Sequence, residues 1–143
     1  MAFGKIRIDK NDQLFSKMIR ERDKRCVLCG DTTRKSECSH FWGRGNKRTR
    51  FDARNAEYLC FTCHMRVEGN KQGAYRDYKI KQLGEKAYEE LRLRAMDTGK
   101  YGEYEKKTLY EYLKEDYKEK RHLSPGWGGY DLSMSSIIKL WNT

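Results

Sequence analysis

The chain has 143 residues, a length typical of one domain, and its 31 Lys and Arg outnumber 21 Asp and Glu to give a net charge of +10. This balance favours a polyanionic partner, and a hydrophobic content of only 37% leaves a modest core. No apolar run approaches the about 18 residues that cross a bilayer, and the charged start of the chain lacks the core of a signal peptide. We therefore expect a cytoplasmic protein without membrane association.

A helix is predicted over residues 9–25. Phe15, Met18 and Ile19 recur at helical spacing and form an apolar stripe. The opposite face is rich in Lys and Arg, which would face either solvent or DNA. The candidate N-terminal caps are Asp9, Asn11 and Asp12.

Two C-x-x-C pairs, Cys26–Cys29 and Cys60–Cys63, dominate the stretch 26–70. Each such turn lets two thiolates reach a tetrahedral metal at about 2.3 Å, and two turns complete a closed zinc shell with no open position for water. The predicted zinc is therefore structural, and the pairing indicates metal in a reducing compartment rather than disulfides. Alone, this pattern would indicate only a zinc-ribbon or treble-clef binding module.

Short elements are predicted around the cysteines. Residues 32–42 suit a β-hairpin or its second strand, and 43–50 form a loop rich in glycine and cations. Residues 55–59 return towards the second cysteine pair, which opens a short helix ending near Val67. A break is expected at Glu68-Gly69-Asn70.

Three helices are predicted in the second half, over 73–83, 85–96 and 103–121. Their tyrosines are expected to pack between helices rather than to stack on bases. The glycine-rich segment 124–129 reads as a flexible connector, and 134–140 as a short apolar helix that docks on the body or on a second subunit.

Three polar residues follow the first cysteine pair in the order His40, Asn55 and His64. A His on a strand, an Asn about fifteen residues later and a His at the start of the next helix have the order of the HNH, or ββα-metal, nucleases. With both cysteine pairs, the surrounding motifs resemble the phage NinG recombination proteins over about residues 14–121. The motifs are Arg20-Glu21-Arg22-Asp23, Ser39-His40-Phe41, Arg50-Phe51-Asp52-Ala53-Arg54-Asn55 and Gly69-Asn70.

The fold class expected from the residues and the resemblance is α+β. A small zinc-stapled treble-clef, ββα-metal (HNH) core would be flanked by an N-terminal helix and C-terminal α-helices. We divide the chain into a basic amphipathic helix (1–25), the nuclease core (26–70), a helical extension (71–121) and a connector with a terminal helix (122–143). These parts are expected to form one compact domain.

The resemblance implies a structure-selective, metal-dependent endonuclease that cuts branched recombination intermediates such as Holliday junctions and D-loops. As a phage protein it would act in the cytoplasm of the bacterial host. A homodimer is expected, because symmetric cuts across a junction require two active sites. The alternatives are a non-catalytic zinc DNA-binding module and an HNH nuclease that acts on linear duplex DNA.

Hydrolysis of a phosphodiester needs an activated water, a cation on the phosphate oxygens and charge relief at the leaving oxygen. We assign His40 the role of general base, because an imidazole with an ordinary pKa near 6.5 accepts a proton near neutral pH. The alternative is a packed or metal-binding histidine. By the resemblance, His64 binds a second, catalytic ion, Mg²⁺ or Mn²⁺. The alternative for His64 is a residue that crowds the zinc shell.

Many HNH sites place an acidic metal ligand directly before the base, where this chain has Ser39. Glu37 lies two residues earlier, so on a strand it faces the same way as Ser39 and could reach the catalytic ion. The alternative is an exposed glutamate. Cys38 alternates to the opposite face and is expected to be buried.

Asn55 is expected to tie the loop to the strand through its amide and so to orient His40. An ordinary Asx-turn is the alternative. His122, beyond the last long helix, is expected at the surface. The candidates for contact with the DNA backbone, each of which could instead be a solvated loop cation, are Arg44, Lys47, Arg48, Arg50 and Arg54.

Overall fold

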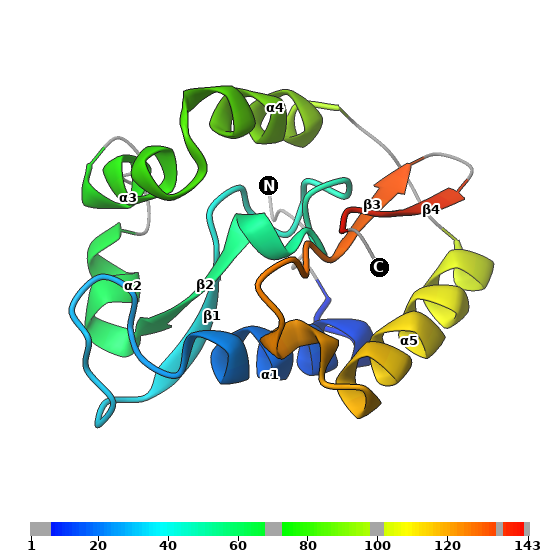
Figure 1. Cartoon of the computed structure of the whole chain (residues 1–143), viewed down its shortest axis with the longest axis horizontal. Coiled ribbons are helices and arrows are strands. Elements are labelled where there is room, and N and C mark those ends of the chain that lie inside the picture. The colour runs from blue at the N-terminus through cyan, green and yellow to red at the C-terminus, as the bar shows by residue number, and fades with distance from the viewer. Residues whose placement is uncertain (1–6, 68–72, 98–101, 134–135, 142–143) are drawn as a thin grey trace, which may run out of the picture.

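The structure is a computed structural model of the whole chain, and it describes residues 7–67, 73–97, 102–133 and 136–141. Helices and short antiparallel strands share this described part, which confirms the expected α+β class (Figure 1). None of the described helices combines the length and hydropathy of a bilayer-spanning segment. The elements in chain order are α1 (Lys10–Asp23), β1 (Ser36–His40), η1 (Ala53–Asn55), β2 (Ala56–Cys60), α2 (Phe61–Val67), α3 (Ala74–Leu83), α4 (Glu85–Ala95), α5 (Glu103–Lys118), η2 (Arg121–Leu123), β3 (Tyr130–Ser133) and β4 (Ser136–Lys139).

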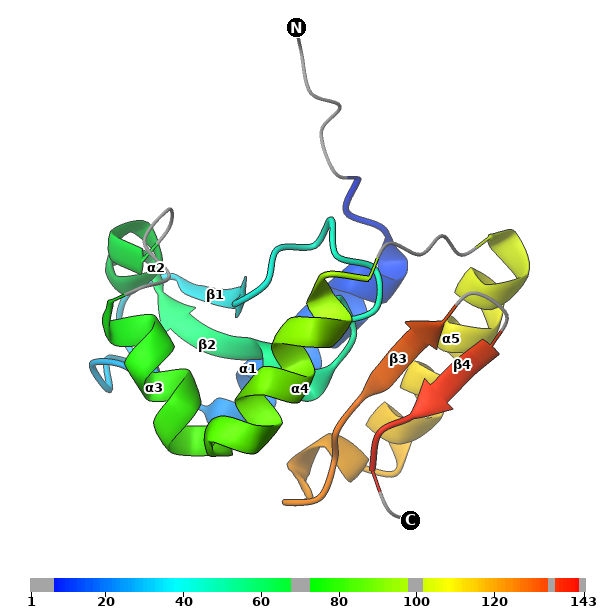
Figure 2. The same cartoon turned by 90° about the horizontal axis from the view of Figure 1, so that it is seen from above.

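The β1–β2 hairpin lies at the centre of the first half of the chain. Its antiparallel register pairs Glu37 with Leu59 and His40 with Ala56. Because side chains alternate along a strand, His40 faces the opposite way from Glu37. Helix α1 runs along one side of the hairpin, α3 and α4 lie on the other, and α2 continues from β2 (Figures 1 and 2). The strand predicted within 32–42 therefore pairs with the segment that returns from the cationic loop.

Two clusters of buried side chains form the core of the described chain. One joins α1 to α5 and the C-terminal segment, and includes Phe15, Ile19 and Leu109. The other surrounds the cysteines and includes Phe41 and Tyr75, whose rings meet edge to face at 4.9 Å. The burial of Tyr75 agrees with the expectation that the tyrosines pack between elements.

Helix α1 begins as predicted, with Asp9 as its N-terminal cap. The Asp9 carboxylate accepts from the amide of Asp12 at 3.0 Å, and the Asp12 carboxylate accepts from the amide of Asp9 at 2.9 Å. This reciprocal capping box satisfies two backbone donors that the helix itself leaves unpaired. Asp12 also binds a cation from the loop after β1, so the cap fixes more than the helix end.

The helices predicted after residue 73 are present. Gly84, with φ of +84°, ends α3 as predicted and leads directly into α4. Helix α5 ends at Lys118 instead of Arg121. The break predicted at Glu68-Gly69-Asn70 lies outside the described residues.

The terminal helix predicted over 134–140 is wrong. Residues of this segment form strand β4, which pairs antiparallel with β3. The β-branched Ile137 and Ile138 suit a strand, and the amide of Leu140 donates to the carbonyl of Gly129 at 3.1 Å. Pairing with β3 therefore outweighs the helical pattern of the isolated segment.

The segment 124–129 is not the flexible connector that its glycines predict. Trp127 is buried, and its indole N–H donates to the Asp116 carboxylate at 3.0 Å. The carbonyl of Gly128 accepts from the amide of Ala53 at 2.8 Å. Gly128 and Gly129 serve close backbone approach.

The surface position expected for His122 is also wrong. His122 lies on η2, and its Nε2–H donates to the Glu21 carboxylate of α1 at 2.9 Å. Its ring stacks on Tyr117 with 5.4 Å between centroids. The turn after α5 carries this side chain back against α1, where it is buried.

Replacing Gly129 by alanine should destabilise the fold. Gly129 has a φ of +75°, and an added Cβ would lie 2.3 Å from the carbonyl oxygen of Phe51. We expect the free energy of unfolding to fall by about 2–4 kcal/mol, from the left-handed conformation and the backbone clash together, in denaturant titrations. Gly126→Ala is the matched control, because a Cβ there meets no atom within 4 Å. Equal stability of the two variants would contradict the close approach.

Candidate metal centre and nucleic-acid interface

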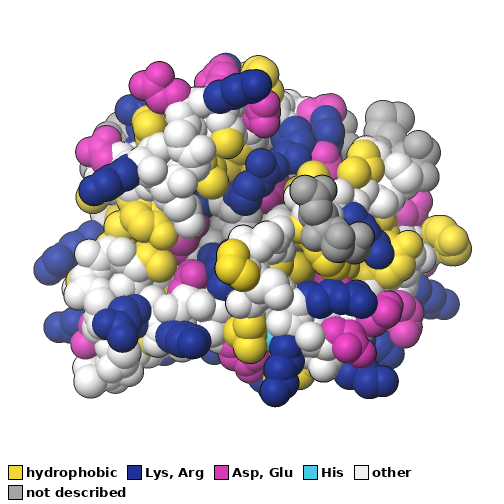
Figure 3. Space-filling view, viewed as in Figure 1, with side chains coloured by type: hydrophobic (Ala, Val, Ile, Leu, Met, Phe, Trp, Pro, Cys, Tyr) yellow, Lys and Arg dark blue, Asp and Glu magenta, His cyan; other side chains and the backbone are white. Residues whose placement is uncertain are grey.

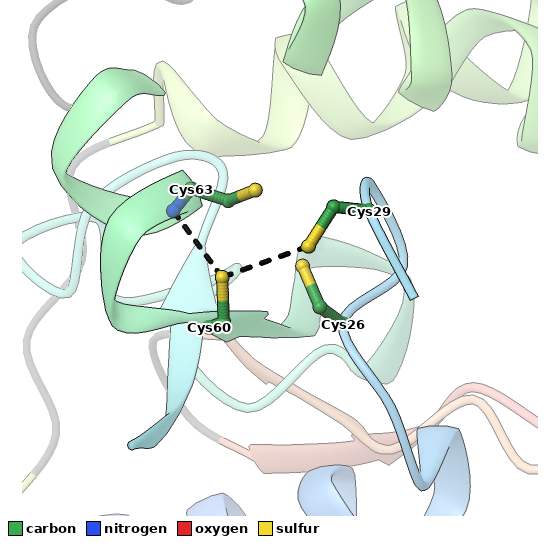
Figure 4. Close-up of side chains that lie close together, drawn as sticks. All are labelled: Cys26, Cys29, Cys60 and Cys63. Carbon is green, nitrogen blue, oxygen red and sulfur yellow. Dashed lines mark hydrogen bonds between the residues drawn. The ribbon is translucent and has the colours of Figure 1, made fainter. Parts of the chain in front are cut away.

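The four thiol groups of the two C-x-x-C pairs converge on one point (Figure 4). The four sulfur atoms lie within 4.8 Å of one another, and the Sγ atoms of Cys29 and Cys60 are 3.7 Å apart. A tetrahedral zinc with Zn–S bonds of about 2.3 Å has S–S edges of about 3.8 Å. The cluster therefore fits the predicted structural zinc.

Local backbone geometry brings the thiols together. Gly30 takes a φ of +79° and its amide donates to the carbonyl of Cys26 at 2.8 Å, which closes the first turn. Cys60 ends β2 and Cys63 lies in the first turn of α2. The amide of Val27 donates to the carbonyl of Tyr58 at 3.0 Å and joins the first turn to β2.

The ionisation of the thiols supports a cation between them. Burial raises the pKa of Cys26, but backbone amides that hydrogen-bond its sulfur outweigh burial and lower this pKa to about 7. Burial and the three neighbouring thiols both raise the pKa of Cys63. Four thiolates in contact repel one another, so the anionic form of the whole cluster requires a metal ion.

A second pair of metal-ligating groups lies beside the thiol cluster. His64 follows Cys63 in α2, and its Nδ1 lies 3.1 Å from the Glu37 carboxylate on β1. The His64 and Glu37 side chains are 31% and 26% exposed, so both reach solvent. The predicted ligands of the catalytic ion are thus in contact. Among the described residues, no third His, Cys, Asp or Glu completes a cluster with them.

His40 is half-buried, and its ring nitrogens are turned towards the interior. Its Nε2–H donates to the carbonyl of Arg50 at 3.0 Å, and its ring lies 5.9 Å from that of Phe15. The Nδ1 atom is buried and finds no hydrogen-bond partner among the described residues. Burial, followed by the positive charge of Arg44, lowers the pKa of His40 to about 3. The prediction that His40 has the ordinary pKa of a general base is therefore wrong for this conformation.

The two histidines are not brought together. His40 lies three residues beyond Glu37, which is about 10 Å along a strand, and its side chain points to the other face of the hairpin. Glu37 is the residue that His64 contacts. The structure therefore unites Glu37 with His64 but separates both from His40.

Asn55 ties the cationic loop to the end of β1. Its Oδ1 accepts from the amide of Trp42 at 2.9 Å, and its Nδ2 donates to the carbonyls of Trp42 at 2.9 Å and Thr49 at 3.1 Å. These are the amide contacts expected from the sequence. They hold the loop backbone and not the ring of His40, which bonds to Arg50.

Two of the predicted DNA-binding cations are used inside the fold. Arg50 is 3% exposed and forms a bidentate ion pair with Asp12, with N–O distances of 2.9 and 2.6 Å. Arg48 binds Asp97 and Asp131, each at 2.7 Å. Both guanidinium groups therefore join the loop to other elements, and in this conformation they are engaged by carboxylates rather than open to phosphate.

The other three candidates are only partly open. Arg54 is paired with Asp52 at 3.3 Å, and the Arg44 Nε lies 3.9 Å from the Asp12 carboxylate. Lys47 is half-buried, and burial lowers its pKa. The basic loop is therefore mainly a structural feature, because the acids that pair with it come from distant parts of the chain.

Glu57, which pairs with Ser39 across the hairpin, forms a fully buried ion pair with Lys79 that the sequence analysis did not identify. The Glu57 carboxylate on β2 accepts from Lys79 of α3 and, at 2.7 Å, from the hydroxyl of Tyr75. Lys79 also donates to the carbonyl of Arg54. The available signal was a glutamate inside a short apolar strand, which requires a buried partner.

The comparison with known families gives one match. A family model described as Bacteriophage Lambda NinG protein matches residues 5–122. The matched region contains both cysteine pairs as well as Glu37 and His64. No curated protein and no solved structure matches the chain.

Loss of the metal should unfold the chain. Zinc binding in small four-ligand sites supplies about 10–16 kcal/mol, comparable with the whole stability of a typical domain. We expect the wild-type chain to carry one zinc per molecule and to lose cooperative thermal unfolding on chelation, and Cys60→Ala to lose both. Cys38→Ala is the control, because Cys38 lies outside the cluster, and it should retain zinc. A folded, zinc-free Cys60→Ala chain would rule out a structural metal.

His40 should make stability depend on pH. Its pKa is about 3 in the fold, against about 6.5 when unfolded, so the unfolded state takes up the proton first as pH falls. Above pH 6.5 His40 is neutral in both states and does not lower the stability. Below pH 6.5 the free energy of unfolding should fall by about 1.4 kcal/mol per pH unit. Denaturant titrations between pH 7.5 and 5 should show this slope in the wild type and a shallower one in His40→Gln. Parallel slopes would show that His40 is exposed to water in the fold.

Proposed function

We propose, from the premise that the chain belongs to the family of the bacteriophage lambda NinG protein, that it is a zinc-stapled, metal-dependent endonuclease that cuts branched DNA. One observation carries the proposal: a half-buried acid–imidazole pair that reaches solvent, Glu37 with His64, lies beside the four-thiol cluster on a β-strand, a second β-strand and a helix in sequence. This order of elements is that of an HNH, ββα-metal core. The substrates are four-way junctions and related recombination intermediates.

The zinc and the catalytic ion have separate sites in this proposal. The four cysteines hold the zinc, whose closed shell leaves no position for water. Glu37 and His64 would hold Mg²⁺ or Mn²⁺, which retain several waters and bind through few protein ligands together with a substrate phosphate. Such an ion supplies charge stabilisation at the phosphate and an acidified water. Because Cys63 is a zinc ligand, the zinc also positions the neighbouring His64.

Exposed cations near this pair would position the DNA backbone. Arg34 and Lys35 directly precede β1, whereas Arg66, two residues after His64 in α2, points to another side of the helix. All three are exposed, unlike Arg48 and Arg50 of the loop. Cations and acids are mixed over the face seen in Figure 3. We transfer the phosphate-binding role from the loop to the start of β1.

The proposed metal-binding role of Glu37 and His64 does not depend on His40 acting as the general base. Its ring would have to leave the Arg50 carbonyl and turn to the other face of the hairpin before it could reach a water near Glu37. The role therefore stays a prediction, whereas the metal role of Glu37 and His64 rests on a contact. Cuts on both strands of a junction would further require two copies of the chain.

The two ring nitrogens of His40, one bonded to the Arg50 carbonyl and one buried, favour a second candidate, a zinc-stapled module that binds branched DNA without cutting it. This module would use the same cations and the same zinc, and Ser39 in place of an acid before His40 is consistent with it. It predicts junction binding and no cleavage with any divalent ion. A nuclease specific for linear duplex would instead cut all DNA forms alike.

Cleavage of labelled DNA separates these functions. We expect the zinc-loaded chain to cut a four-way junction in Mg²⁺ or Mn²⁺ to 5′-phosphate and 3′-hydroxyl ends, and to leave a linear duplex of the same sequence intact. Without added divalent ion there should be no product. Glu37→Gln and His64→Ala should lower the rate about 100-fold or more, because each removes a ligand of the catalytic ion, while junction affinity is retained.

Glu90→Gln is the matched control for Glu37→Gln, since Glu90 is an exposed glutamate on α4. It should cut at the wild-type rate. A wild-type rate in Glu37→Gln would show that Glu37 is not a ligand of the catalytic ion. Junction binding without any cleavage by the wild-type chain would support the non-catalytic binding module instead. In parallel, His40→Ala tests the base role directly: an unchanged rate would show that His40 only packs.

A further inference from the structure

Helix α2 exposes two large apolar side chains that the core does not use. Phe61 is 48% exposed and Met65 is 58% exposed. They lie four residues apart, one helical turn, and therefore share a face. We call these two side chains the α2 platform.

The α2 platform lies beside the proposed metal-binding pair. His64 precedes Met65 directly and lies three residues after Phe61, so it occupies the edge of the same helix face. The amide of Phe61 donates to the carbonyl of Lys35 at 2.9 Å, which places the platform against the start of β1. Two residues further along β1, Glu37 contacts His64.

The charges around the platform indicate what covers it. Lys35 and its neighbour Arg34 are exposed cations on the β1 side, with Arg34 3.7 Å from the Asp31 carboxylate. Arg66 is also exposed on α2 but lies on another side of the helix. A polyanion whose backbone binds these cations would lie next to the α2 platform. The part of a nucleic acid that fits an aromatic ring and a polarisable thioether is the face of a base.

We propose that the α2 platform stacks on an unstacked nucleobase at a DNA branch point and so selects branched over linear DNA. The inference deepens the proposed function and rests on it for the class of substrate. Phosphate contacts alone carry little information about DNA form, because phosphates line duplex and junction alike. Base faces are covered by their neighbours inside a duplex and become accessible where strands exchange. A ring next to the metal pair would thus position the strand exchange point at the site of cleavage.

The test measures binding and not cleavage, so it is independent of nuclease activity. The zinc-loaded full chain is titrated, without Mg²⁺ or Mn²⁺, into a fluorescently labelled four-way junction and into a linear duplex of the same sequence. Phe61→Ala should weaken junction binding about tenfold and leave duplex binding unchanged. Phe61→Leu, which keeps the apolar bulk without the ring, should show most of this loss, and Phe61→Trp should retain affinity. Met65→Ala should show a smaller loss.

Tyr104→Ala is the matched control, because Tyr104 is an exposed aromatic on α5. It should bind both DNA forms as the wild type does. Equal losses on junction and duplex, or no loss in Phe61→Ala, would overturn the proposal. So would a change of oligomeric state on ultracentrifugation, which would identify the platform as a protein interface. Loss of junction preference in a chain that never cuts would support the platform while the nuclease proposal fails.

Discussion

Four thiol groups that converge on one point are the constraint on which the structure depends. They join a turn after α1 to the junction of β2 and α2, inside one of the two apolar clusters of the core. A zinc bound there would fix the end of β2 and the first turn of α2 together. Every side chain on that turn, including His64, would then take its position from the metal. Metal binding and the folding of the site would be one event.

Ion pairs join the elements that lie away from the four cysteines. Arg50 with Asp12 joins the cationic loop to the cap of α1, and Arg48 with Asp131 joins the same loop to β3. Breaking one partner of such a pair leaves an uncompensated charge in the interior, so these contacts fix geometry even where their net stabilisation is small. Among the described residues, part of the high content of Lys and Arg therefore builds the fold, and in the proposed function the exposed cations would contact DNA.

The proposed function divides the first half of the chain between two faces of one hairpin. The face with Glu37 carries the metal-binding pair and adjoins the apolar platform on α2, while the face with His40 packs against α1. In this proposal, the cations attract DNA and the acid–imidazole pair holds the catalytic ion. The α2 platform stacks on a base that is accessible only where strands exchange. Selectivity for branched DNA then comes from an apolar contact, because charge does not discriminate between DNA forms.

The sequence by itself predicted the four-cysteine cluster, the α+β class and the capped first helix, and it suggested Glu37 as a ligand of the ion that His64 would bind. These follow from ligand spacing, helical periodicity and strand alternation, which act over a few residues. Tertiary structure alone decided the contact of His40 with the Arg50 carbonyl, the internal use of Arg50 and the change of the C-terminal segment from helix to strand. Each of these depends on a partner that lies far along the chain. A local pattern shows that a cation or a glycine is present, but the fold decides which distant carboxylate or backbone meets it.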